Sequence, residues 1–187
     1  MEDADLMTPP SVTRRLTLED APALARLLTD NREFLAPWEP IRDPGFYTAD
    51  GQREVLRALL DRCELGLTIP HVVLNQGGAV AGRITLDGIA RGAFQSCGMG
   101  YWVAGPDNGR GLATASVAEL VRIAFVDLGL HRVEAGTLLH NTRSQRVLER
   151  NGFVRYGIAP AMVSIAGLWQ DHVMFQRIND DWQSPAG

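Results

Sequence analysis

The sequence has few of the features that would place a protein outside the cytoplasm. No apolar run in its 187 residues is long enough to span a membrane, and the first ten residues, MEDADLMTPP, have neither the basic nor the apolar region of a secretory signal. Its two cysteines, Cys63 and Cys97, are too few for a disulfide framework and do not have the spacing of metal ligands. We therefore expect a cytoplasmic protein without a metal site.

The usual nucleotide-binding fingerprints are also missing. The sequence has no G-x-x-x-x-G-K-[ST], which excludes a P-loop, and no G-x-G-x-x-G with an acidic residue about twenty positions later, which excludes the dinucleotide-binding fingerprint. The formal net charge of -4 argues against nucleic acid as a partner and favours a cationic or amine-bearing substrate.

The composition is that of one folded domain. Hydrophobic residues make up 45% of the chain and charged residues 21%, and the length is short for two separate cores. We predict a single domain over residues 1–187, with residues 1–10 as an acidic tail.

Hydrophobic periodicity predicts the order of the elements. Alternation indicates a strand over residues 11–18, and helical spacing indicates a helix with Asp20 as its N-cap. Residues 31–47 hold prolines and aromatics without a period, and we predict a structured loop there. The other predicted elements are a helix over 50–65, a hairpin around Gln76 to Gly78, a strand over 96–105, a helix over 112–128, a strand over 131–139, a helix from Asn141 to Gly152, and two strands that turn near residues 166–167. This order predicts an α+β fold with helices on the faces of a mixed sheet.

The segment GPDNGRGLATASVAEL, residues 105–120, places glycines directly before a helix. Glycine lets the backbone approach a ligand closely, and the first amides of a helix have no internal partners and favour negative charge. On these residues alone, an anion site and a plain glycine turn are equally good interpretations.

Residues 99–153, MGYWVAGPDNGRGLATASVAELVRIAFVDLGLHRVEAGTLLHNTRSQRVLERNGF, resemble the acetyl-coenzyme A core of the GNAT N-acetyltransferases. The turn from Asn108 to Ala113 matches the Q/R-x-x-G-x-G/A pattern of that superfamily except at Asn108. The segments NREFLAPWEP, NTRS, NGF and GLWQDHV narrow the resemblance to the ribosomal-protein-alanine N-acetyltransferases, the Rim group, over about residues 12–178. This resemblance implies a mostly antiparallel sheet of about seven strands flanked by about four helices, with the coenzyme core at about residues 96–153.

The resemblance implies acetyl-coenzyme A as co-substrate and no metal. The pyrophosphate would lie on the amides of the turn, and the pantetheine along the end of the strand before it. The coenzyme-binding residues implied are Tyr101, Trp102, Val103, Gly109, Arg110, Gly111, Leu112, Ala113, Thr114 and Asn141. Because neighbouring strand residues face opposite sides, we expect one of Tyr101 and Trp102 in the core and the other in the cleft.

The resemblance makes Ser144 the hydroxyl that donates to the departing coenzyme A thiolate. Glu39 is the first candidate base, because the aromatics of its loop would desolvate the carboxylate and raise its pKa. Glu134 is the second candidate, and a structural role is open for both. Trp38 and Glu39 would form a wall of the acceptor groove, with a packed lid as the alternative. The four histidines are interpreted as structural.

Three functions are open at this level. The resemblance favours acetyl transfer to the N-terminal α-amine of a protein, a ribosomal protein foremost. A small-molecule amine such as an antibiotic or a toxin is the alternative acceptor, and a coenzyme A-binding regulatory module without turnover is the alternative of another class. No membrane partner is expected. The oligomeric state cannot be read from the sequence, and a homodimer is open.

Overall fold

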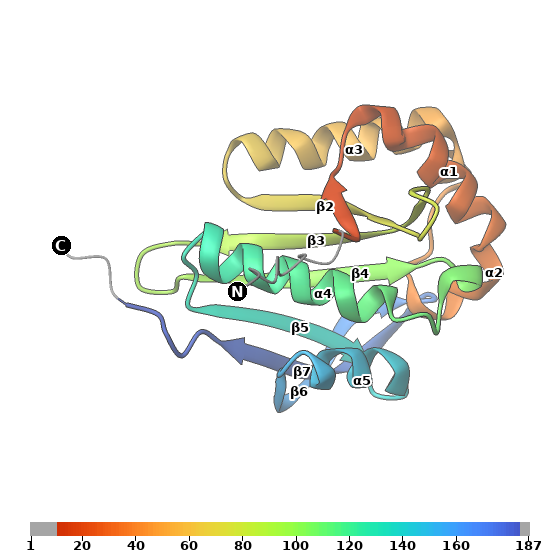
Figure 1. Ribbon diagram of the computed structural model, residues 1–187. Coiled ribbons are helices and arrows are strands. Elements are labelled where there is room, and N and C mark those ends of the chain that lie inside the picture. The colour runs from red at the N-terminus through yellow and green to blue at the C-terminus, as the bar shows by residue number, and fades with distance from the viewer. Residues whose placement is uncertain (1–10, 184–187) are drawn as a thin grey trace, which may run out of the picture.

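The chain folds around one mixed sheet. In the computed structural model, which describes residues 11–183, seven strands pair in the order β1-β2-β3-β4-β5-β7-β6 (Figure 1). β4 and β5 are parallel, and all other neighbours are antiparallel. The strands are β1 (Thr13–Arg15), β2 (Thr68–Leu74), β3 (Val80–Ala90), β4 (Ser96–Val103), β5 (Arg132–Leu138), β6 (Val154–Ile165) and β7 (Leu168–Ile178). The predicted α+β fold and its mostly antiparallel sheet are confirmed.

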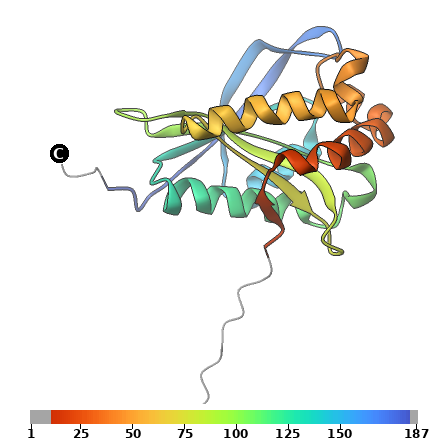
Figure 2. The same cartoon turned by 90° about the horizontal axis from the view of Figure 1, so that it is seen from above.

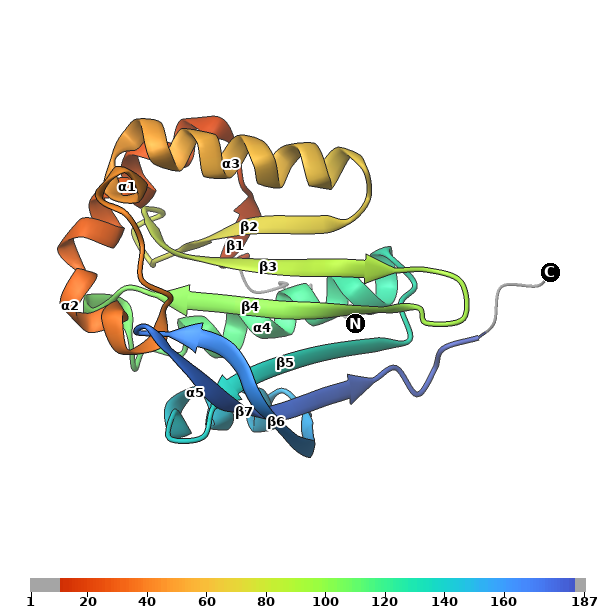
Figure 3. The same ribbon diagram turned by 180° about the vertical axis from the view of Figure 1, so that it is seen from behind.

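Helices cover the two faces of the sheet unevenly. α4 (Leu112–Arg122) lies across the middle strands on one face (Figure 1), whereas the β6–β7 hairpin rises on the opposite side of the sheet (Figure 2). From behind, the helices of residues 11–183 leave the middle of β4 uncovered (Figure 3). The other α-helices are α1 (Ala21–Asp30), α2 (Arg32–Leu35), α3 (Ala49–Glu64) and α5 (Thr142–Arg150). The side of the sheet on which no helix of the described residues covers the middle of β4 is called the open face below.

The limits of three elements differ from the predictions. The first strand covers residues 13–15 rather than 11–18, because a 3-10 turn begins at Leu18. The helix predicted over 112–128 becomes a π-helix at Ile123–Asp127. Residues 31–47, predicted as a loop, contain α2 and 3-10 turns at Ala36–Trp38 and Pro44–Tyr47, where prolines fix the first-turn φ. The described chain thus has five α-helices where about four were expected.

Two apolar clusters attach the helices to the sheet. The larger packs α4 on one face, and the smaller packs α1 and α3 on the other, through Leu24, Leu56 and Val72. Val72 is in register with Arg83 on β3, and Arg83 is in register with Trp102 on β4. Because residues paired across strands share a face, Arg83 and Trp102 lie on the face of the smaller cluster, which continues into the open part of the sheet.

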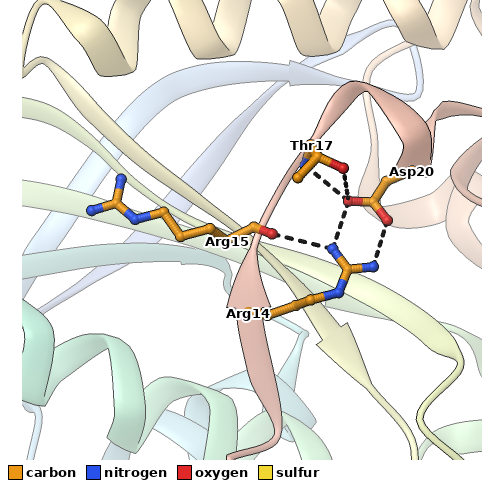
Figure 4. Close-up of polar contacts among 4 residues, drawn as sticks. All are labelled: Arg14, Arg15, Thr17 and Asp20. Carbon is orange, nitrogen blue, oxygen red and sulfur yellow. Dashed lines mark hydrogen bonds and ion pairs between the residues drawn. The ribbon is translucent and has the colours of Figure 1, made fainter.

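Asp20 occupies the predicted N-cap position of α1, but its side chain does not cap the helix. Its carboxylate instead accepts hydrogen bonds from the Arg14 guanidinium at 2.7 and 2.8 Å and from the Thr17 amide at 2.9 Å (Figure 4). Burial acts to raise the pKa of Asp20, but the hydrogen bonds from Arg14 and Thr17 outweigh it and hold the pKa below its ordinary value. This network ties β1 to the start of α1.

Replacing Asp20 with asparagine should destabilise the protein by about 1 to 3 kcal/mol at pH 7, because an amide cannot accept both guanidinium bonds. The folded-state pKa is lowered, so this stabilisation is present above the ordinary Asp pKa of about 3.9 and is lost as the pH falls through the folded value. Urea unfolding of both proteins at pH 7 and pH 3 measures the effect. The matched control is Asp50→Asn at an exposed pair, which should change little. A difference as large at pH 3 as at pH 7 would contradict the assignment.

Candidate active site

β4 and β5 separate part-way along their length. They pair only where residues 96–98 of β4 meet residues 132–134 of β5. Beyond that point β4 continues to Val103 and β5 to Leu138 without pairing with each other, and the two strands diverge in Figure 3. The facing backbone groups therefore have no sheet partner across this split.

Two cavities meet at the split. The larger, of about 720 Å³, lies on the open face and is lined by β3, β4, β5 and β7 and by Glu39. The smaller, of about 270 Å³, lies on the helical face beside Ala113 of α4 and Val147 of α5. The residues that line both cavities are Leu35, Trp38, Tyr101, Trp102, Asn141 and Ser144. The split thus connects a ligand-sized space on each face of the sheet.

The end of β4 presents its backbone to the split. The Ala104 amide donates to the Ala81 carbonyl at 2.8 Å and so continues the ladder with β3. Because bonding alternates along a strand, the amides of Tyr101 and Val103 point away from β3, toward β5. The side chains of Tyr101 and Trp102 both line the cavities, each packed against a different apolar cluster. The prediction that one of them would be core is wrong, because the split opens β4 on both faces.

The glycine-rich turn leaves a row of amides without partners at the start of α4. Gly109 and Gly111 have φ values of +77° and +82°, a left-handed conformation that other residues rarely adopt. Within residues 11–183, the amides of residues 109–111 donate to no backbone carbonyl, and the first amides of α4 have no acceptor inside the helix. An extended anion such as a pyrophosphate fits this row.

Asn108 fastens the turn to the end of β4. Its side-chain amide donates to the carbonyls of Val103 at 2.8 Å and Ala104 at 3.0 Å. On the other side, the Gly105 amide donates to the side-chain oxygen of Asn31 at 2.8 Å. Asn108, where the family pattern has Gln or Arg, therefore fixes the backbone of the turn through hydrogen bonds of its side chain.

Replacing Gly111 with alanine should weaken acetyl-coenzyme A binding by about 10-fold or more, because a Cβ in this left-handed conformation costs about 1 to 2 kcal/mol and displaces the row of amides. The matched control is Gly129→Ala, at a glycine with φ +63° and open space around its Cβ position, which lines neither cavity. Calorimetric titration of both variants with acetyl-coenzyme A, after each has been shown to be folded, separates the two effects. Equal affinity losses would mean that the amides of this turn do not bind the coenzyme.

α5 begins at the junction of the two cavities. The side-chain oxygen of Asn141 accepts the Ser144 amide at 3.1 Å, which confirms the predicted N-cap. The Ser144 hydroxyl lies 2.8 Å from the phenol oxygen of Tyr101. Burial raises the pKa of Tyr101 to about 12, so the phenol stays protonated; it donates to the Ser144 carbonyl at 3.3 Å, and either hydroxyl can be the donor in the 2.8 Å contact. When the phenol is the donor, the hydroxyl hydrogen of Ser144 is free to point at another acceptor in the cavity.

The segment after α2 forms one wall of the larger cavity. The Trp38 ring lies 5.4 Å from the His140 ring, and the Glu39 carbonyl accepts the Ala166 amide at 3.0 Å, so both ends of this wall are held. Burial raises the pKa of the Glu39 carboxyl, against the opposing charges of Arg42 and Arg83. A partly buried carboxylate of this kind is a suitable proton acceptor.

The other carboxylates of the larger cavity already have partners. The Asp87 carboxylate accepts a hydrogen bond from the Arg62 guanidinium at 2.6 Å. The Glu134 carboxylate accepts hydrogen bonds from the Arg132 guanidinium at 2.6 Å and from the Tyr156 hydroxyl. Within residues 11–183 the Glu39 carboxylate makes no ion pair, so it is available to an acceptor amine. Of the two candidate bases, Glu39 and Glu134, Glu39 is therefore the better one.

The structure places the predicted site residues around the two cavities. Ser144, Trp38 and Glu39 line the larger one. Of the predicted coenzyme-binding residues, Tyr101, Trp102, Val103, Ala113 and Asn141 line the smaller one, and Gly109, Arg110, Gly111, Leu112 and Thr114 form the turn and helix start beside it. The Leu112 side chain is buried in the core, so only its backbone is available to a ligand. The contacts of all these residues with ligands stay predictions.

No site role was predicted from the sequence for His172 and Arg83, although both line the larger cavity. His172 is buried in its wall, with Nδ1 3.1 Å from the Gln170 carbonyl, although it was interpreted as structural. Arg83 lies on β3, where alternation makes a charged residue look solvent-facing. The GLWQDHV segment contains His172 and was the only signal for it, whereas no pattern marked Arg83.

Within residues 11–183, no group of three or more His, Cys, Asp and Glu residues is arranged to hold a metal ion. The helices of the same residues are all too short or too polar to cross a membrane.

Known proteins are similar to this chain in sequence and in fold. The model of the Acetyltransferase (GNAT) domain matches residues 12–154. Probable N-acetyltransferase YjcK of Bacillus subtilis (strain 168) is 36% identical over 169 residues, 90% of this chain and 93% of that protein. The ribosomal protein uS5-alanine N-acetyltransferase of Escherichia coli (strain K12) is 30% identical over 178 residues, 95% of this chain and 92% of that protein. The solved structure of Mycobacterium smegmatis RimJ in complex with CoA-disulfide is 28% identical with a TM-score of 0.87, over 92% of this chain and 83% of that one.

Proposed function

Since the chain belongs to the GNAT acetyltransferase family and is an acetyl-coenzyme A-dependent N-acetyltransferase of the Rim type, we propose that its acceptor is the N-terminal α-amine of a protein, a ribosomal protein foremost. The observation that carries this proposal is the wall formed by Trp38 and Glu39, which lies in the segment NREFLAPWEP and borders the larger cavity. The relative from Escherichia coli is similar over nearly the whole chain, and its name states that it is an N-acetyltransferase of an alanine of ribosomal protein uS5.

The smaller cavity and the adjoining turn fit the coenzyme. The amides at residues 109–114 suit the pyrophosphate, and the unpaired edge of β4 would bond the pantetheine as an added strand does. Asn141 lies where the arm would reach the junction. When bound, the coenzyme supplies an acetyl thioester, whose carbonyl carbon accepts an amine.

Three groups of the chain would then act at the junction. The Val103 amide, which points into the split, would donate to the acyl oxygen and stabilise the charge that develops there. Glu39 would accept the proton of the acceptor ammonium, directly or through water. As the new C–N bond forms and the C–S bond breaks, Ser144 would donate its hydroxyl proton to the departing sulfur, and the second proton that the nitrogen loses on becoming an amide would return to Ser144. A thiol has an ordinary pKa of about 8.5, so this modest donor suffices.

An α-amine suits a site with one carboxylate base. Its ordinary pKa is about 7.7 to 8.0, against about 10.4 for a lysine side chain. About a tenth or more of an α-amine is neutral at pH 7, whereas less than about a thousandth of a lysine is. Alignment of the amine with the thioester would therefore supply most of the rate. Because the chain belongs to an enzyme family, the alternative of a non-catalytic module has no support.

Mass spectrometry of protein N-termini tests the acceptor. Cells with and without this protein should differ by one acetyl group of 42 Da at the N-terminus of one ribosomal protein, and purified enzyme should restore it on the isolated protein. If no protein N-terminus changes while small amines release coenzyme A thiol from acetyl-coenzyme A in vitro, the acceptor is a small molecule and the proposal fails.

A further inference from the structure

Arg83 is a cation in the acceptor cavity without a direct partner. Within residues 11–183 its side chain makes no ion pair, whereas Asp87 and Glu134 in the same cavity are paired. Glu39 also makes no ion pair there and lines the same cavity. The two opposite charges thus border one space without closing on each other.

The position of Arg83 relates it to the reacting atoms. It is in register with Trp102 on β4, next to the Val103 amide that points into the split. Its side chain lies on the open face of the sheet, because the neighbouring Ile84 belongs to the cluster beneath α4. Arg83 therefore faces the space that an acceptor must enter to reach the junction.

The electrostatics of Arg83 favour an oxygen ligand. Burial lowers the pKa of the guanidinium, and the charge of Glu39 opposes this shift. A guanidinium nevertheless keeps its proton at neutral pH and has only donors to offer. Partial removal from water without a partner costs free energy, which a ligand oxygen would recover.

We propose that Arg83 determines acceptor specificity by binding the carbonyl oxygen next to the reacting amine, while Glu39 holds the nitrogen. In a peptide N-terminus or an amino acid amide, a single carbon atom lies between the amine nitrogen and the carbonyl carbon. The amine can therefore contact a carboxylate while the carbonyl oxygen contacts a guanidinium. A polyamine has no such oxygen and brings a second cation against Arg83. The inference rests on the proposed function in that it assigns an acceptor contact within the same site.

A pair of acceptors isolates this contact. Alaninamide and isopropylamine carry the amine on the same methyl-bearing carbon, but isopropylamine has a methyl group in place of the carboxamide. The kcat/KM values of the wild type, Arg83→Met, Arg83→Lys and Arg53→Met are measured for both amines. Arg53 lies on α3, is paired with Asp50 and lines neither cavity, so its variant is the control. The ratio of the two kcat/KM values cancels partial unfolding, and comparison between variants cancels the difference in amine pKa.

Arg83→Met should lower kcat/KM for alaninamide by about 10- to 100-fold and that for isopropylamine by less than about 2-fold, the range for a hydrogen bond to a charged group. Arg83→Lys keeps the charge but loses the paired N–H donors of the guanidinium, so its kcat/KM for alaninamide should lie between those of the wild type and Arg83→Met. Arg53→Met should match the wild type. An unchanged ratio in Arg83→Met overturns the proposal; if that variant does not fold, an unchanged ratio in Arg83→Lys overturns it. If the ratio depends on Arg83 but no protein N-terminus loses acetylation in cells, the carbonyl contact stands and only the proposed protein acceptor fails.

Discussion

Replacing Ser144 with alanine should lower kcat by about 100-fold or more while changing the Kd for acetyl-coenzyme A by less than about 2-fold. The hydroxyl lies at the junction of the cavities and, in the proposed reaction, meets the sulfur only as the C–S bond breaks. It therefore stabilises the transition state and adds little to binding. Thiol release under saturating substrates gives kcat, and calorimetric titration gives Kd.

Two further variants make this result specific. Tyr101→Phe should lower kcat by about 10-fold, because it removes the phenol oxygen, which lies 2.8 Å from the Ser144 hydroxyl and also donates to the Ser144 carbonyl at 3.3 Å. Ser164→Ala, at a β6 serine that lines neither cavity, should behave as the wild type. Equal losses of kcat and coenzyme affinity in Ser144→Ala would show that this serine binds the coenzyme and does not act as the acid.

Replacing Glu39 with glutamine should lower kcat/KM by about 100-fold at pH 7 and remove the acidic limb of its pH profile. A base must be deprotonated, so wild-type kcat/KM should rise with pH through the pKa of Glu39, which burial raises above the ordinary value. Glutamine cannot titrate, and the variant should retain only the rise that belongs to the acceptor amine itself. The measurement is kcat/KM against pH for a peptide with N-terminal alanine.

The exposed Glu33 on α2 supplies the control, and Glu33→Gln should leave the profile unchanged. Folding is not expected to explain a loss in Glu39→Gln, because removing a partly buried charge that has no ion pair relieves a desolvation cost. If Glu39→Gln keeps the wild-type acidic limb, the base is a different group or water alone, and the carboxylate of this wall only shapes the cavity.

Periodicity and turn residues were enough to predict most of the fold. The glycines that end and begin elements, and caps such as Asn141, act within a few residues of where they stand, so their effect can be read locally. The predictions were wrong at Leu18 and at Pro37, where the structure has 3-10 turns instead of a strand end and a loop. Short 3-10 turns have no apolar period of their own, and prolines within an aromatic segment were read as loop signals although they initiated turns.

The site was harder to predict from short sequence patterns, because its residues are far apart in the sequence. The bond between Tyr101 and Ser144 joins residues 43 positions apart, and it exists only because β5 carries α5 back beside β4. The face toward which Arg83 points follows from its register with Val72 and Trp102. A pattern of residue types contains neither fact, and the family resemblance named Trp38 and Glu39 but not Arg83 for the acceptor half of the site.

Around the split where the two cavities meet, the protein has no side chain suited to carry the acetyl group as a covalent intermediate. Cys97 is buried, with its pKa raised to about 12, and neither cysteine lines either cavity. Within residues 11–183 the Ser144 hydroxyl is hydrogen-bonded to the Tyr101 phenol and to no imidazole, so it is a poor nucleophile. Acetyl-coenzyme A bound without an amine should therefore wait unreacted, and no label should exchange between free and acetylated coenzyme until an acceptor occupies the opposite face.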